Sequence, residues 1–201
     1  MSKKIFTFFT VLILLNGCAK MKPIDFKNTI PLFVLEEYFE GKTSAWGIFE
    51  DRFGNIRRQF TVDITGTWNG QNLILDEQFV YNDGERDQRI WTINKIDANT
   101  YSGSADDVIG TANGKAYGNA LNWRYDMNLK IGTSTVKVHF NDWMFLQSSG
   151  VLLNRAKISK FGIELGTVTL AFIKTKKNGT VSDSEINEQL PAALVFREAN
   201  Q

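Results

Sequence analysis

The stretch that decides the fold is residues 121–129, which read Leu-Asn-Trp-Arg-Tyr-Asp-Met-Asn-Leu. Every second residue is apolar, and a polar or charged residue stands between each apolar one and the next. Alternation of this kind puts all the apolar side chains on one face of a β-strand and all the polar ones on the other. The stretch therefore predicts a strand with one buried face.

The same alternation recurs along the chain on both sides of this stretch. The clearest further segments are residues 60–64, 73–81, 136–140 and 168–172. Turn-forming sequences separate them, among them Asn69-Gly70, Asn82-Asp83-Gly84, Gly132-Thr133 and Ser148-Ser149-Gly150. About eight to ten antiparallel strands with no helix between them imply a meander. Because strands in that number avoid open edges by closing, we predict an all-β protein whose meander forms a barrel.

A short helix is predicted just before the first strand. Pro31 suits the first turn of a helix and Gly41 suits its end, so the expected helix spans residues 31–40. Leu32, Leu35 and Phe39 fall on one face of it. We expect that apolar face to pack against the barrel.

The first residues have the pattern of an export signal. Lys3 and Lys4 precede an apolar run at residues 5–15, which is shorter than the roughly 20 residues that a spanning helix needs. The sequence Leu15-Asn16-Gly17-Cys18 resembles the bacterial lipobox, although Asn16 departs from its usual small or aliphatic residue. We predict a cleaved signal peptide at residues 1–17, a lipidated Cys18 with a tether over residues 18–30, and one β-barrel domain over residues 31–201. A secreted protein cut elsewhere, with a free thiol, is the alternative.

The residue after the cysteine indicates the membrane. Ala19 is not the aspartate that retains lipoproteins in the inner membrane of enteric-type bacteria. We therefore expect attachment to the outer membrane, facing the periplasm. An outer-membrane barrel would show the same alternation with its apolar face outward. A lipid anchor would be redundant on such a barrel, so we expect the apolar face to point inward.

Composition excludes several classes of function. The net charge is +1, and removing Lys3 and Lys4 with the leader leaves 21 basic residues against 22 acidic ones. Such a balance gives no basic surface for nucleic acid. The chain has one cysteine and one histidine, His139, which excludes a disulfide and most zinc sites. We predict no cofactor and no metal. In the alternating pattern His139 falls among the polar residues, so its side chain is expected on the outer face.

Several polar residues stand at the alternate positions otherwise held by apolar residues, so they are expected on the apolar face. They are the candidate ligand-binding residues. A buried carboxylate is costly unless it is paired or protonated, and an arginine–carboxylate pair inside the barrel could also bind a ligand head group. Large aromatic residues on the same face would line any cavity. The predicted ligand-binding set is Glu77, Arg89, Trp91, Trp123, Tyr125, Asp142 and Asn154. A structural ion pair, or a bulge that turns these groups to water, is the alternative.

Two adjacent acids, Asp106 and Asp107, cannot both face inward on a strand. One of them could join Glu77 or Asp142 as an acid pair for general acid–base chemistry. No residue is assigned as catalytic on this basis. Gly110, Gly114 and Gly118 lie in a polar run and are expected to form bends or bulges.

A series of short motifs carries a family resemblance. In order they are Tyr38-Phe39-x-Gly41, Ala45-Trp46-Gly47-Ile48-Phe49, Leu75-Asp76-Glu77-x-Phe79, Asp83-Gly84-Glu85, Arg89-x-Trp91, Ala105-Asp106-Asp107-Val108-x-Gly110, Asp142-Trp143-Met144 and Asn154-Arg155-Ala156. The series, over about residues 39–172, resembles the bacterial lipoprotein family of domain of unknown function 3833. The resemblance implies a lipocalin-like barrel whose helix closes one end, with Gly41 and Trp46 similar to the glycine and tryptophan that open lipocalins. It implies no established activity, and it directs the ligand prediction towards lipid.

Three functions follow from these features. The first is a membrane-anchored barrel that binds or carries an apolar ligand, a fatty acid or lipid, at the periplasmic face. The second is a lipid-modifying enzyme of the isomerase or hydratase type on the same barrel, with Glu77, Asp106 or Asp142 as acid or base. The third is a purely structural envelope lipoprotein with a solid barrel. A cavity of roughly a few hundred Å³ would separate the third from the others.

Overall fold

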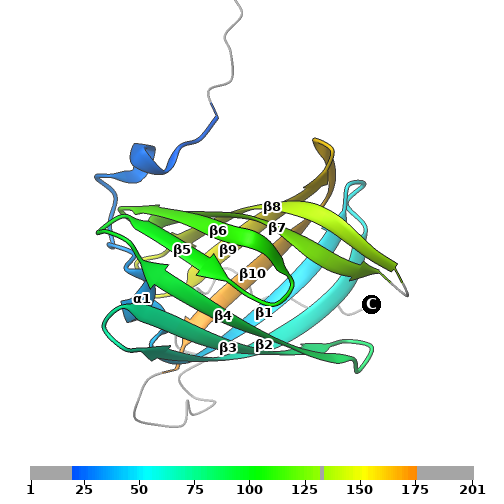
Figure 1. Ribbon diagram of the computed structural model, residues 1–201, viewed down its shortest axis with the longest axis horizontal. Coiled ribbons are helices and arrows are strands. Elements are labelled where there is room, and N and C mark those ends of the chain that lie inside the picture. The colour runs from blue at the N-terminus through cyan, green and yellow to red at the C-terminus, as the bar shows by residue number, and fades with distance from the viewer. Residues whose placement is uncertain (1–19, 132–133, 176–201) are drawn as a thin grey trace, which may run out of the picture.

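The computed structural model describes residues 20–131 and 134–175. Within them, ten antiparallel strands close into a barrel in the order β1-β10-β9-β8-β7-β6-β5-β4-β3-β2 (Figure 1). The strands are β1 Gly41–Asp51, β2 Ile56–Trp68, β3 Asn72–Tyr81, β4 Arg86–Lys95, β5 Thr100–Ser104, β6 Val108–Tyr117, β7 Ala120–Ile131, β8 Ser134–Leu146, β9 Leu152–Lys160 and β10 Ile163–Lys174. Two short helices precede them, η1 Pro23–Phe26 and α1 Leu35–Phe39. The predicted fold class is confirmed.

The apolar face of the alternating segments points into the barrel. In β7, Leu121 and Met127 are only 1% and 2% exposed, whereas Arg124 and Asn128 face outward. Burying a large apolar side chain stabilises the fold by about 1.5–3 kcal/mol. The inward set on all the strands therefore supplies most of the driving force for closure, and the same set surrounds the interior where a ligand could lie.

Two glycines make room for one large aromatic ring of that interior. A Cβ on Gly103 or Gly114 would come within 2.7 Å or 2.2 Å of the Trp123 ring. The prediction that Gly114 forms a bend is wrong, because it occupies a regular position in β6 opposite Trp123. The prediction holds for Gly110, where the register of β6 against β7 shifts.

The helix α1 closes one end of the barrel, as Figure 1 shows, but it starts later than predicted. Phe33 lies outside α1, and its N–H donates to the Gly118 carbonyl at 2.7 Å, so this segment bonds to the β6–β7 turn instead of forming a helical turn. The Ile30–Pro31 peptide bond is cis, and Leu32 is 67% exposed, outside the expected apolar stripe. Leu35, in α1 itself, is buried as expected.

A buried ion pair fastens α1 to the barrel. Glu36 is 6% exposed, accepts a hydrogen bond from the Tyr101 hydroxyl at 2.9 Å, and pairs with the Lys95 ammonium. Burial opposes the charge of Glu36, but the hydrogen bonds from Lys95 and Tyr101 outweigh it and hold the pKa of Glu36 below its usual value. The closed end is therefore fixed by polar bonds as well as by apolar packing.

Part of the expected tether packs on the outer wall of the barrel. The Phe26 ring lies 5.9 Å from that of Trp143 and 5.5 Å from that of Phe145. The Thr29 hydroxyl donates to the side-chain oxygen of Asn119 at 2.7 Å and accepts from its backbone N–H at 3.0 Å. The chain thus enters the barrel at the end that α1 closes.

Some predictions fall outside the described residues. They are the signal peptide, Cys18 and the turn at Gly132-Thr133. In the part of the chain that the structure describes, no helix has both the length and the apolar character needed to cross a membrane.

Candidate functional site

The barrel encloses a cavity of about 530 Å³. Its floor includes Leu35 and Phe39 of α1, and Arg57 and Arg58 lie at the opposite rim, next to the β1–β2 turn. A structural barrel with a solid core would have this space filled, so the cavity disfavours that alternative. All seven residues of the predicted ligand-binding set line the cavity, from five different strands.

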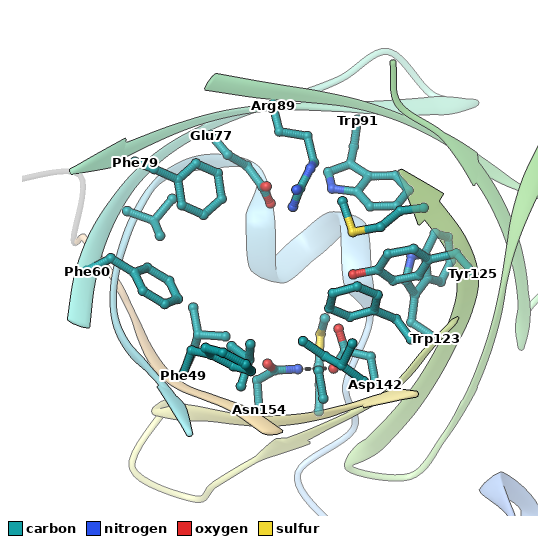
Figure 2. Close-up of a pocket in the computed structure, with 18 of the residues that line it drawn as sticks. Phe49, Phe60, Glu77, Phe79, Arg89, Trp91, Trp123, Tyr125, Asp142 and Asn154 are labelled. Atoms are coloured by element: carbon teal, nitrogen blue, oxygen red, sulfur yellow. Dashed lines mark hydrogen bonds between the residues drawn. The ribbon is translucent and has the colours of Figure 1, made fainter. Parts of the chain in front are cut away.

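Aromatic rings form much of the cavity wall. On one side the Trp91 ring packs edge-on against Trp123 at 5.8 Å and Tyr125 at 5.3 Å, and Tyr125 stacks on Phe140 at 4.9 Å. Towards the rim, Phe60 and Phe79 lie 6.0 Å apart, and Phe49 joins them in the lining (Figure 2). The rim phenylalanines were absent from the predicted set, although their inward parity could have identified them.

Arg89 projects into the cavity from β4, opposite Glu77 of β3 in the register of the two strands. Its Nε donates to Asp107 at 3.0 Å and its Nη2 donates to the same carboxylate at 2.8 Å. The predicted arginine–carboxylate pair therefore exists, but its acid is Asp107, from the β5–β6 turn. Asp106 is exposed, and Asp107 pairs with Arg89 instead of joining Glu77 or Asp142 as an acid pair.

Glu77 lies beside this pair and points towards the Arg89 guanidinium (Figure 2). Burial raises the pKa of Glu77 to about 7, and the positive charge of Arg89 offsets only part of that effect. For Arg89, burial acts against the charge, but the neighbouring Tyr125, Glu77 and Asp107 raise its pKa further above the usual value. The guanidinium stays charged, while Glu77 can change its protonation state near neutral pH.

Asp142 faces the cavity from β8, on the wall across from Glu77 (Figure 2). It is 7% exposed, and its side-chain Oδ1 accepts a hydrogen bond from Asn154 of β9. Burial raises the pKa of Asp142 to about 7. Burial and then the nearby Asp142 charge also raise the pKa of Tyr125, so that hydroxyl remains protonated and can donate a hydrogen bond.

We define the polar belt as the cavity-lining residues Glu77, Arg89, Tyr125, Asp142 and Asn154, together with Asp107, the partner of Arg89, which lies outside the lining and is 33% exposed. The belt offers hydrogen-bond acceptors and two carboxyl groups that titrate near pH 7. It can orient a polar group of a bound molecule or exchange a proton with it. No cluster of three or more His, Cys, Asp or Glu side chains suited to a metal ion occurs among the described residues.

His139 lies outside this site, as predicted. Its Nδ1 is 2.8 Å from the Asp126 Oδ1, and its side chain is 48% exposed on the outer wall. Trp46, expected from the lipocalin resemblance to mark the start of the barrel, is also on the outer wall and is 51% exposed. Neither residue contributes to the cavity.

Comparison with known proteins agrees with this architecture. The chain is similar to the solved structure of an S-type phycobiliprotein lyase from Guillardia theta, with a TM-score of 0.53, 6% identity, and coverage of 72% of this chain and 92% of that chain. At that identity the likeness shows the fold alone, a lipocalin-like barrel. No curated protein sequence matches the chain. The family described as "Protein of unknown function (DUF3833)" matches residues 12–174, which is most of the sequence, and the chain therefore belongs to that family.

Proposed function

We propose that this protein is a lipid-anchored carrier whose lipocalin-like barrel binds one apolar ligand, a fatty acid or another lipid, at the periplasmic face of the envelope. The observation that carries the proposal is the 530 Å³ cavity, with apolar walls and a narrow polar belt. Most small-molecule sites in proteins combine a concave apolar surface with a few fixed polar groups.

The cavity volume suits a single-chain amphiphile. At the ~30 Å³ that a water-sized group occupies in a liquid, 530 Å³ holds roughly 17 such groups. Each methylene removed from water contributes about 0.8 kcal/mol, so a chain of roughly ten gains about 8 kcal/mol before the cost of immobilisation. A gain of that size supports binding at micromolar concentrations or weaker.

The leader motif supports the location. Diacylglyceryl transfer to the Cys18 thiol, followed by acylation of the new amino terminus, would give more than one chain, which is what stable membrane attachment requires. Ala19 favours the outer membrane. A barrel held there would work next to a large pool of lipid.

The test is to fill the cavity and measure the lipid that co-purifies with the anchored protein. Val168 lines the cavity, and the adjacent Thr169 is exposed on the outer wall. We expect Val168→Trp to reduce co-purifying lipid at least about fivefold, because the indole takes up much of the space that the lipid's hydrocarbon chain would occupy. Thr169→Trp should retain the co-purifying lipid. Equal lipid content in wild type and in both variants would contradict binding inside the barrel.

A lipid-modifying enzyme is the second candidate, and one observation favours it. Glu77 and Asp142 face the same cavity, and burial raises the pKa of each to about 7, which suits proton transfer at neutral pH. Conversion of the co-purified lipid by wild type, lost in Glu77→Gln or Asp142→Asn, would establish the enzyme. Lipid that stays chemically unchanged after long incubation would support the carrier function instead.

A further inference from the structure

The polar belt carries more acidic than basic side chains. The belt contains three carboxyl groups, those of Glu77, Asp107 and Asp142, and a single guanidinium, Arg89. Asp107 holds that guanidinium through its Nε and Nη2, the side-on arrangement by which arginine clamps a carboxylate. Arg89 is thus already neutralised, and the remaining carboxyl groups give the belt an excess of acidic oxygen.

The other cations that line the cavity do not change this balance. Arg57 pairs with Asp51 at 2.6 Å, and Arg58 pairs with Asp83 at 3.0 Å and also contacts Glu85. Both arginines, together with the exposed Lys130 near the end of β7, lie at the rim away from the belt, where water screens their charges. A head group inside the barrel meets the belt, not these rim cations.

The belt atoms that remain free to bond a ligand are mainly hydrogen-bond acceptors. Among the described residues, the one hydrogen bond to the Asp142 side chain comes from Asn154 and goes to Oδ1, which leaves Oδ2 for a ligand. Glu77 directs its carboxyl into the cavity, towards the Arg89 guanidinium. Buried acceptors of this kind favour a partner that donates hydrogen bonds and penalise one that brings another negative charge.

We propose that the cavity selects amphiphiles with a hydrogen-bond-donating or cationic head, such as an amine or an alcohol, over those with a carboxylate. The head group lies at the belt between Glu77 and Asp142, and the chain lies along the aromatic wall. This inference rests on the proposed function, since it specifies the ligand of the same cavity. It narrows the sequence-based expectation that an arginine–carboxylate pair binds a ligand head group, and it favours another lipid over the fatty acid named in the proposed function.

The test compares three photoreactive probes with the same twelve-carbon chain and a diazirine near its end, bearing an amine, a hydroxyl or a carboxylate. The full anchored chain in lipid nanodiscs is irradiated with each probe at pH 7.5, and labelled peptides are mapped by mass spectrometry. Labelling of inward residues on β7, such as Met127, reports cavity binding, whereas labelling of exposed Asn128 reports only surface contact.

We expect the amine and alcohol probes to label the cavity at least about tenfold more than the carboxylate probe, because like charges in a partly buried site repel strongly. The double variant Glu77→Gln/Asp142→Asn should lose this preference while retaining labelling by the alcohol. Equal or stronger labelling by the carboxylate probe in wild type would overturn the head-group inference and leave the carrier function standing. Absence of cavity labelling by all three probes would overturn the carrier function itself.

Discussion

Replacing Asp142 with asparagine should make the protein more stable at alkaline pH and should change little at acidic pH. The Asp142 carboxyl is 7% exposed, and burial raises its pKa from 3.8 to about 7. The asparagine keeps the side-chain shape and an oxygen that can accept from Asn154, as the carboxyl does now. The substitution therefore removes an ionisable group with minimal change in packing.

The magnitude follows from the difference between the folded and unfolded pKa. As pH rises from about 4 to 7, Asp142 in the unfolded chain releases its proton while Asp142 in the folded barrel keeps it. The folded state is then the one that binds more protons, so its stability falls across this range and levels off above pH 7. A pKa difference of about three corresponds to about 4 kcal/mol, and water in the cavity reduces that figure.

The assay is urea unfolding of the purified full chain, followed by tryptophan fluorescence at pH 5, 6, 7 and 8. Asp142→Asn should gain stability over wild type from pH 5 to pH 8, by about 2–4 kcal/mol. Asp63→Asn is the matched control, because Asp63 is exposed on the outer wall, and it should stay within about 0.5 kcal/mol of wild type throughout. A constant difference between Asp142→Asn and wild type at all four pH values would refute the reasoning.

Three further outcomes are expected. Gly114→Ala should destabilise the barrel by about 1–3 kcal/mol in thermal unfolding, because the new Cβ would come within 2.2 Å of the Trp123 ring; an unchanged Tm would contradict that contact. Glu36→Gln should cost about 1–3 kcal/mol, because it leaves Lys95 without its buried partner; hydrogen exchange in α1 should rise, and unchanged exchange would show that packing alone holds the helix. Cys18→Ala should move the protein from the membrane fraction to the soluble fraction, and unaltered fractionation would refute the anchor.

The barrel could be predicted from sequence because its signal is local. In residues 121–129 each side chain's face depends only on its neighbours two positions away, so Trp123 and Tyr125 could be assigned to the interior before any partner strand was known. The same argument placed Glu77 and Asp142 in the cavity. Parity fixes a side chain's direction, whatever the shape of the turns.

The pairings inside the site depend on geometry that parity does not contain. Asp107 reaches Arg89 from the β5–β6 turn, whereas the sequence offered Glu77 and Asp142 as equally reasonable partners. The start of α1 was mispredicted for a similar reason. Phe33 lies outside the helix because its N–H donates to the Gly118 carbonyl, a residue distant in sequence. Local propensity is overridden by such tertiary bonds.

The route by which the chain enters the barrel bears on where a bound ligand would enter and leave. Phe26 packs on the outer wall and α1 closes the adjoining end, whereas Arg57 and Arg58 lie at the opposite, open rim. The thirteen residues of β2 span about 40 Å along the strand, and less along the tilted barrel axis. If Cys18 carries lipid, as proposed, a ligand at the opening would lie about a barrel's length from the segment that leads to the anchor. Such an arrangement would favour exchange of the ligand with a second protein over its direct extraction from that membrane.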